Sequence, residues 1–324
     1  TTSYPSPHRR SSSSRDGTGW RVVPGPRLTR MDARQPDPTG PSSISVAMAT
    51  FNGETYLPEM LDSLAGQTRP PDELVVRDDG SSDATVRIVE DFAGRAPFQV
   101  QVLTGEHLGY AQNFVAATRE CSGDLIFFAD QDDSWRPGKL ETVARAADPG
   151  AQALFHDFAL VSGDGKQIAP SYYRLLADRG YGPGIALKGC SMAVTRSFVD
   201  SWGWPPAGTA VSHDFWVALL ATAFGQRRNL DDILIDHRLH EANTSGWVPD
   251  DSSRVFTEPG GTSGEVDVLI DLVVKPPRLR GWTQVFLDAV DERGERIDPD
   301  AAQRLRRSLR TNRRRHRAAR AAAG

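Results

Sequence analysis

Short apolar runs alternate with helical patterns over the first half of the folded region. The runs have the length of β-strands and few polar interruptions; they are Ile44–Ala49, Leu74–Val76, Phe98–Leu103 and Leu125–Phe128. Between them, apolar residues recur at helical spacing, as in Leu57, Met60, Leu61 and Leu64. Apolar strands that alternate with helices are typical of a parallel sheet covered by helices on both faces. We therefore expect an α/β fold.

The pattern becomes mixed after residue 136. It predicts strands at 153–161 and 233–235, a strand at 185–194 that Gly189-Cys190 interrupts, and helices at 139–146 and 214–223. Beyond Val248 the signal weakens. Residues 266–274 fit a strand or a helix, residues 282–290 predict a helix, and residues 299–322 predict a long helix of Ala and Arg.

The first 43 residues are rich in Ser, Pro, Gly, Thr and Arg. Such a segment has too few apolar side chains to offset the entropy lost on ordering, so we expect it to be disordered. The chain then divides into three parts. They are a disordered tail at 1–43, a folded domain at 44–250 with halves at 44–135 and 136–250, and a C-terminal extension at 251–324 that ends in the Arg-rich helix.

Composition excludes several classes of protein. No run approaches the roughly 18 apolar residues of a membrane span. Residues 1–40 also lack the apolar core of a signal peptide. The two cysteines, Cys121 and Cys190, form neither a disulfide framework nor a CxxC zinc site, so we expect a cytoplasmic protein.

Positive charge is concentrated at the C-terminal end. Residues 301–324 contain nine Arg and no acidic residue, so the rest of this chain of net charge −4 carries −13. A nucleic-acid-binding domain has its positive charge on the folded surface, so we expect no nucleic-acid partner. The Arg-rich end fits a solvated helix end, a peripheral contact with an anionic membrane, or an oligomer contact.

Two acidic clusters directly follow predicted strands. They are Asp78-Asp79-Gly80-Ser81-Ser82-Asp83 and Asp130-Gln131-Asp132-Asp133. Ligands of such sheets bind beyond the carboxyl ends of the strands, so this placement itself indicates a site. Carboxylates two positions apart can hold one hard cation, Mg²⁺ or Mn²⁺, and leave coordination positions open for phosphate oxygens. The structural alternative is an acidic turn whose Asp or Ser caps the next helix.

Several of these segments together resemble glycosyltransferase family 2. The resemblance rests on Val46–Gly53, Glu73–Ser81, Asn113-Phe114, Gly123–Phe128 and Asp130–Trp135, in this order and spacing. The form Asp-Gln-Asp-Asp-x-Trp is most similar to the bacterial rhamnosyltransferase branch. The similarity spans residues 44–247. It implies a GT-A fold with a Rossmann-like, mostly parallel central sheet flanked by helices, a nucleotide-binding half at 44–135, an acceptor half at 136–250 and a helical C-terminal extension.

The resemblance also implies the donor site. Phe51 would stack on the base and Asp79 would accept a hydrogen bond from it, while Ala49, Asn52 and Asn113 complete the nucleotide-binding set.

The resemblance makes Asp130 and Asp132 ligands of Mg²⁺ or Mn²⁺ against the diphosphate. His240 is the third candidate ligand, because residues 237–246 are similar to a family segment of the form His-x-x-Asn-x-x-Gly. Two alternatives stay open there. A lone histidine is usually structural, and Arg238 could instead neutralise the phosphates.

Asp214 opens the predicted helix at 214–223, and the resemblance makes it the general base. Inversion needs a carboxylate that takes the proton of the acceptor hydroxyl. The structural alternative is an acid favoured by the helix dipole. We place seven residues in the sugar and acceptor pocket: Asp133, Trp135, Gly189, Cys190, His213, Trp216 and Arg238. Cys190 is interpreted as a small buried residue rather than a nucleophile, because inversion needs no covalent intermediate.

The sequence thus predicts a metal-dependent, inverting hexosyltransferase. The branch resemblance indicates transfer of rhamnose from dTDP-rhamnose. The donor is a dTDP- or UDP-sugar, and the acceptor is a glycan, a lipid-linked molecule or a small molecule in polysaccharide, cell-wall or natural-product assembly. A non-catalytic nucleotide-sugar-binding module is the first alternative. A nucleotidyltransferase is the second, although Asn52-Gly53 is too short for the Gly-rich phosphate loop that it needs.

Overall fold

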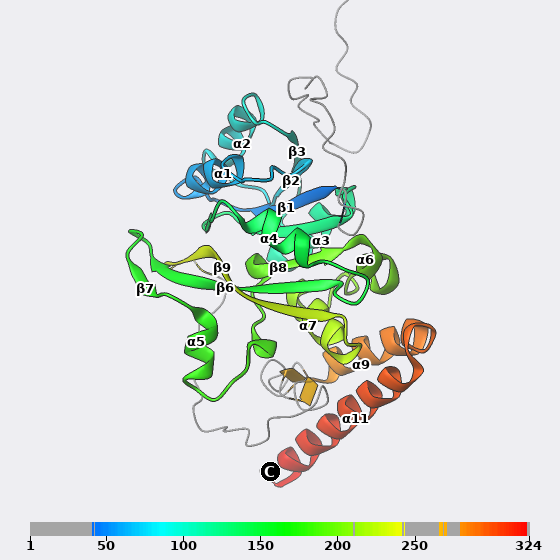
Figure 1. Cartoon of the computed structure of the whole chain (residues 1–324). Coiled ribbons are helices and arrows are strands. Elements are labelled where there is room, and N and C mark those ends of the chain that lie inside the picture. The colour runs from blue at the N-terminus through cyan, green and yellow to red at the C-terminus, as the bar shows by residue number, and fades with distance from the viewer. Residues whose placement is uncertain are drawn as a thin grey trace, which may run out of the picture.

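The structure is a computed structural model, and it describes residues 41, 43–209, 211–241, 243, 266, 267, 269, 270 and 279–322. These residues form one mixed β-sheet flanked by helices (Figure 1). The predicted disordered tail lies almost wholly outside the described residues, as does most of the stretch from 244 to 278.

The strands supply the frame of the fold. In chain order they are β1 Ile44–Thr50, β2 Glu73–Asp78, β3 Gln99–Thr104, β4 Leu125–Asp130, β5 Ser134–Trp135, β6 Ala153–Ser162, β7 Gln167–Ala169, β8 Met192–Thr195 and β9 Arg227–Leu239. Their order in the sheet is β3-β2-β1-β4-β8-β6-β9-β5, with β7 paired to β6. The first four are parallel, whereas β8 runs antiparallel to β4 and β6. The strands up to β4 therefore form the predicted parallel sheet, and the later strands make the sheet mixed.

Helices cover this sheet and extend it at the C-terminal end. They are α1 Leu57–Ala65, α2 Thr85–Ala93, α3 Tyr110–Glu120, α4 Lys139–Ala146, α5 Tyr172–Ala177, α6 Arg196–Trp202, α7 His213–Ala223, α9 Leu279–Ala289, α10 Glu295–Ile297 and α11 Pro299–Ala322, with short turns η1 Pro183–Ile185, η2 Gly189–Ser191 and the π-helical η3 Val290–Gly294. The apolar stripe from Leu57 to Leu64 is buried in α1, as its spacing predicts. Ser171 and Thr195 begin α5 and α6 as side-chain N-caps. None of the described helices is both long enough and apolar enough to cross a membrane.

The carboxyl ends of β1, β2 and β4 meet at one edge of the sheet. Ala49 of β1 pairs with Asp130 on one side and with Arg77 on the other. The two acidic segments that follow β2 and β4 therefore lie on either side of the loop that leaves β1. This edge holds the candidate site.

One predicted strand is much shorter than expected. Of residues 185–194, only those from Met192 onward form a strand, and the preceding residues fold into η1 and η2. The cause is local, because the N–H and the hydroxyl of Ser191 both donate to the carbonyl of Lys188 and close a tight turn. That turn places Gly189 and Cys190 beside the acidic residues at the end of β4.

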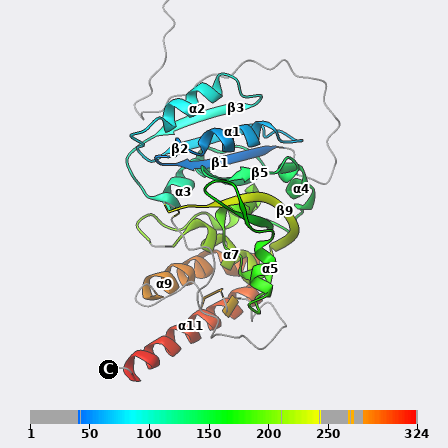
Figure 2. The same ribbon diagram turned by 90° about the vertical axis from the view of Figure 1, so that its left-hand side faces the viewer.

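The C-terminal extension packs on α7 at the end of the molecule away from α2 and β3 (Figures 1 and 2). The Phe286 ring of α9 lies 5.4 Å from that of Phe215 and 5.1 Å from that of Trp216. Leu305 and Leu309 of α11 are buried. The predicted helical extension is thus present, and α11 has the predicted bounds.

Candidate active site

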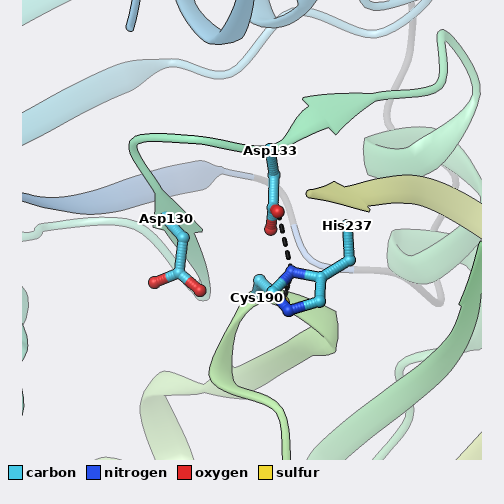
Figure 3. A group of neighbouring side chains, drawn as sticks. All are labelled: Asp130, Asp133, Cys190 and His237. Carbon is cyan, nitrogen blue, oxygen red and sulfur yellow. Dashed lines mark hydrogen bonds and ion pairs between the residues drawn. The ribbon is translucent and has the colours of Figure 1, made fainter. Parts of the chain in front are cut away.

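Three aspartates lie at the end of β4 and on the turn that leads to β5. We call residues Asp130–Asp133 the acidic turn. Asp130 is the last residue of β4, and Asp133 directly precedes β5. Ligand atoms of Asp130, Asp133, Cys190 and His237 all lie within 4.8 Å of one another (Figure 3). Burial raises the pKa of Asp130 to about 7, and the charges of Asp133 and Asp132 add to that shift. No described residue donates a hydrogen bond to the Asp130 carboxylate, so both of its oxygens are uncommitted.

Asp132 faces the end of β9. Its Oδ2 lies 2.7 Å from His240 Nε2 and accepts a hydrogen bond of 3.3 Å from Asn243 Nδ2. Burial raises the pKa of Asp132, and the neighbouring Asp133 charge adds to this. The pairing of β5 with β9 brings His240 to the acidic turn. The structure therefore brings two of the three predicted metal ligands, Asp132 and His240, into contact, whereas Asp130 is grouped with Asp133, Cys190 and His237.

Asp133 is wholly buried and forms an ion pair with His237. Its Oδ1 lies 2.7 Å from His237 Nδ1 and accepts a hydrogen bond from the Arg238 N–H at 3.1 Å. Its Oδ2 is buried and has no partner among the described residues. Burial alone would raise the pKa of this carboxyl, but the charge and hydrogen bond of His237 hold it below its ordinary value. Asp133 in turn raises the pKa of His237 against the effect of burial.

A buried lysine supports the turn from the other side. The Nζ of Lys139 donates to the carbonyl of Cys190 at 2.7 Å and lies 3.5 Å from the centre of the Trp135 ring. Burial lowers the pKa of Lys139 to about 7, against the attraction of Asp133 and Asp130. Burial also raises the pKa of the Cys190 thiol well above its ordinary value, which keeps the sulfur protonated. This environment fits a packing role for Cys190.

Asp214 is the only residue of α7 that is not buried. Its Oδ1 accepts hydrogen bonds from the Ser212 hydroxyl and the Phe215 N–H. No described residue donates to its Oδ2. The carboxylate is therefore held at one oxygen and open at the other, which suits a proton acceptor.

Gly189 separates Asp214 from the acidic turn. A Cβ at position 189 would lie 2.8 Å from His213 Nε2 and 3.9 Å from the Cβ of Asp214. The His213 ring stacks on Phe128, with centroids 5.2 Å apart. Burial lowers the pKa of His213, and neither ring nitrogen has a hydrogen-bond partner among the described residues. An unpaired buried N–H costs about 1–3 kcal/mol, so a neighbouring ligand group that accepted it would recover this energy.

An exposed aromatic face lies at the carboxyl end of β1. The side chain of Phe51 is 43% exposed, and its ring centre lies 4.8 Å from that of His107. The Gln131 amide fixes the loop by bonding the N–H of residue 51 at 2.8 Å and its carbonyl at 3.0 Å. Asn52 has a φ of 47°, and its Oδ1 accepts from the N–H of Ser82. Phe51 and Asn52 therefore remain at the surface, where the sequence places them.

Two predicted nucleotide-binding residues are buried instead. Asp79 accepts hydrogen bonds from the Arg77 guanidinium and from the N–H groups of residues 108 and 109. Asn113 bonds the Arg77 side chain and the carbonyls of Arg77 and Thr50. Both side chains are 2% exposed. They brace the strand ends, and their polar groups are already occupied by the protein.

Like Asp133, Cys190 and His213, the other three large side chains predicted for the sugar and acceptor pocket pack in the interior. Trp135 and Trp216 are 3% and 1% exposed, and Trp216 stacks on Phe286 of the extension. The Arg238 guanidinium bonds Glu59 and two backbone carbonyls. In the sequence, an aromatic side chain such as Trp135 or Trp216 fits a core position and a ligand-binding position equally well. The Arg238 guanidinium already pairs with protein groups, so in this structure it is not available to neutralise phosphates.

Comparison with known proteins shows which family part of this arrangement resembles. Residues 45–201 match the model of glycosyl transferase family 2. Over this range, which is just under half of the chain, the sequence is similar to that family. The matched range includes Phe51, Asp79 and the acidic turn, and it ends before Asp214 and His240. The match therefore covers the parallel half of the sheet and the first part of the mixed half.

Similar proteins agree with this assignment. An uncharacterised glycosyltransferase of Nostoc sp. is 24% identical over 220 residues, which cover 62% of this chain and 66% of the relative. The chain spans 66% or less of the length of the curated relatives it matches.

Two solved structures share the fold. TarS of Staphylococcus aureus, in complex with UDP-GlcNAc, is superposed with a TM-score of 0.52 and 20% identity, over 86% of this chain and 92% of TarS residues 1–349. The mannosyltransferase PcManGT of Pyrobaculum calidifontis, in complex with GDP-Man and Mn²⁺, has a TM-score of 0.50 and 18% identity, over 95% of this chain and 80% of that one. The described residues thus have the GT-A fold that the sequence predicts.

Proposed function

We propose that the chain is a metal-dependent, inverting glycosyltransferase that takes a sugar from a nucleoside-diphosphate donor. One observation supports this most. The uncommitted Asp130 carboxylate lies near Cys190, and Asp214 with its open Oδ2 lies near Gly189, so both adjoin the same short turn, η2. A diphosphate leaving group needs the first feature, and an acceptor hydroxyl needs the second.

The acidic turn suits a hard cation. Asp130 has two free oxygens, and Asp132 and His240 add a carboxylate and an imidazole that hold each other at 2.7 Å. Carboxylate oxygen is the preferred donor for Mg²⁺ and Mn²⁺. The protonated Cys190 thiol is a poor ligand, which argues against a soft metal. The cation would supply positive charge to the leaving diphosphate.

The exposed ring of Phe51, beside His107, gives the nucleotide base a stacking face. Ala49 and Asn52 lie at the same strand end, within reach of a base that stacks there. A hydrogen bond from the base to Asp79 requires the loop at residues 108 and 109 to release that carboxylate.

Asp214 performs the proton transfer in the proposed reaction. It takes the proton of the acceptor hydroxyl as the hydroxyl oxygen bonds to the anomeric carbon. The bond from that carbon to the diphosphate oxygen breaks on the opposite face, so the configuration inverts and the nucleoside diphosphate leaves with the bonding electrons. Ser212 and the Phe215 N–H hold Oδ1 and thereby orient Oδ2. Proton transfer to a positioned carboxylate typically contributes about 10²–10⁴-fold to the rate.

Rhamnose from dTDP-rhamnose is the proposed donor sugar, and it rests on the Asp130–Trp135 segment alone. Structures with this fold bind different donors, because TarS contains UDP-GlcNAc and PcManGT contains GDP-Man. A UDP-sugar is therefore the second donor to test. The proposed acceptor is a hydroxyl of a glycan, a lipid-linked molecule or a small molecule.

A donor screen with the full chain tests this function. The assay measures release of nucleoside diphosphate from dTDP-, UDP- and GDP-sugars with Mn²⁺, with Mg²⁺ and with EDTA. We expect turnover with one class of donor, abolished by EDTA and lowered at least about 10²-fold in Asp132→Ala and Asp214→Asn. Asp91→Asn removes an exposed carboxylate from α2 and serves as the control.

Each outcome of the screen separates one alternative. Donor binding without turnover in the wild-type chain would favour a non-catalytic binding module. Formation of a nucleotide sugar from a sugar phosphate and a nucleoside triphosphate would favour a nucleotidyltransferase. Undiminished turnover in Asp214→Asn would show that Asp214 is not the general base, without contradicting the proposed donor site.

A further inference from the structure

The C-terminal helix α11 has two faces of different chemistry. One face packs on the rest of the molecule through Ala302, Leu305 and Leu309, all of which are buried. The opposite face is exposed and has four arginines; they are Arg304, Arg307, Arg310 and Arg314. Steps of three and four residues keep these side chains on one side of a helix. We call these four residues the basic face of α11.

The basic face has no acidic partner among the described residues. None of its arginines forms an ion pair there, whereas Arg306 on the side of the helix pairs with Asp291 and Glu295 and so fixes α11 on the extension. After Asp300 the helix contains no acidic residue at all. Among the described residues, an intramolecular salt bridge therefore accounts for the presence of Arg306 but not for the four arginines of the basic face.

The position of α11 makes this face accessible to a large partner. The helix lies at the end of the molecule opposite α2 and β3, and both views show it on the outside of the extension (Figures 1 and 2). Residues before 301 have a net charge of −13. An anionic surface would repel most of the molecule and attract this end, which gives the contact a defined orientation.

We propose that the basic face of α11 docks on an anionic lipid surface. The four arginines span eleven residues, or about 15 Å of straight helix. The exposed residues of that face include no aromatic side chain, which single-stranded nucleic acids require for base stacking. They include no large apolar side chain either, so the helix rests on the headgroups and does not insert. A flat array of phosphate headgroups matches a straight row of charges.

The expected effect follows from the number of arginines. Each basic residue near an anionic bilayer strengthens binding about fivefold. Removal of four should therefore weaken binding by up to several hundredfold at low salt. The effect should shrink as salt rises, because exposed charges are screened over about 10 Å at moderate ionic strength.

Vesicle co-sedimentation of the full chain tests the proposal. Phosphatidylcholine vesicles with and without phosphatidylglycerol are compared at low and at moderate salt. The test variant combines Arg304→Gln, Arg307→Gln, Arg310→Gln and Arg314→Gln. The control variant removes the same charge from exposed arginines of α2, α3 and α4 and the α2–β3 loop, as Arg87→Gln, Arg95→Gln, Arg119→Gln and Arg145→Gln. Thermal unfolding of both variants shows whether each retains the fold.

The expected result is salt-sensitive binding to phosphatidylglycerol vesicles by the wild-type and control chains, lowered at least about tenfold in the test variant. Equal binding by all three chains, or no binding by the wild type, overturns the proposal. A change of oligomeric state in the test variant without any vesicle binding would identify the basic face as an oligomer contact. Release of nucleoside diphosphate from a soluble donor should be the same in all three chains, so failure here is distinct from failure of the proposed transferase activity.

Discussion

Replacing His237 by Phe is expected to destabilise the fold by leaving Asp133 without its ion-pair partner. Asp133 has no exposed surface, and the His237 imidazole lies 2.7 Å from its Oδ1. In the variant only the Arg238 N–H continues to donate to that carboxylate. Phe fills the space of the imidazole, so the lost interaction is the charge pair and not packing volume.

The expected cost is large for a single side chain. Removal of one partner from a buried ion pair costs about 3–5 kcal/mol, because the remaining charge stays buried without compensation. A typical domain is stable by only about 5–15 kcal/mol. The variant His237→Phe with Asp133→Asn should recover part of this loss, because the second change removes the unpaired charge.

The pH dependence of the difference follows from the two pKa shifts. Asp133 has a lowered pKa in the folded protein, so its contribution is complete above the ordinary aspartate value of 3.8 and is lost as pH falls through the folded pKa. His237 has a raised pKa, so its contribution is complete below the ordinary histidine value of 6.5 and is lost as pH rises through the folded pKa. The wild type and the single variant should therefore differ most between these two values.

Urea unfolding across this pH range measures the difference. His156→Phe is the matched control, since that histidine is also buried in the sheet and bonds only the carbonyl of Asp157. Its loss should cost about 1 kcal/mol. Equal free energies of unfolding for the wild type and His237→Phe, or a difference that does not change with pH, would refute the ion pair.

Two further predictions concern the proposed site. Gly189→Ala should lower kcat of the proposed transferase by about tenfold or more, because the new methyl would lie 2.8 Å from His213 Nε2 and must displace groups beside Asp214. Gly182→Ala is the control, because a Cβ at that position meets no neighbour. Unchanged kcat in both variants would show that η2 has room for the methyl group. Mn²⁺ affinity should fall about tenfold for each pH unit below 7, because binding displaces the proton of Asp130, whose pKa is about 7 without metal. Calorimetric titration one unit on either side of 7 measures this, and equal affinities would contradict it.

Local patterns in the sequence predict the carboxylates at the strand ends, but they do not predict which residues pair with them. Asp130 and Asp132 could be located because a buried strand ends where a run of carboxylates begins. The family resemblance names His240 only as a candidate ligand, and the structure adds its contact with Asp132. His237 and Lys139 could not be found this way. Each pairs with a residue that is distant in the sequence, 104 and 51 positions away, and no local spacing marks such a pair.

The burial of Trp216 and the position of the proposed base also depend on residues distant in the sequence. Helix α7 is apolar all round, so its sequence does not show which side faces a ligand. The extension decides this, because Phe286 packs against Phe215 and Trp216, the two residues that follow Asp214. With those side chains covered by α9, Asp214 alone remains unburied on its helix. The orientation of the base thus depends on helices beyond residue 201, where the match to the family 2 domain ends.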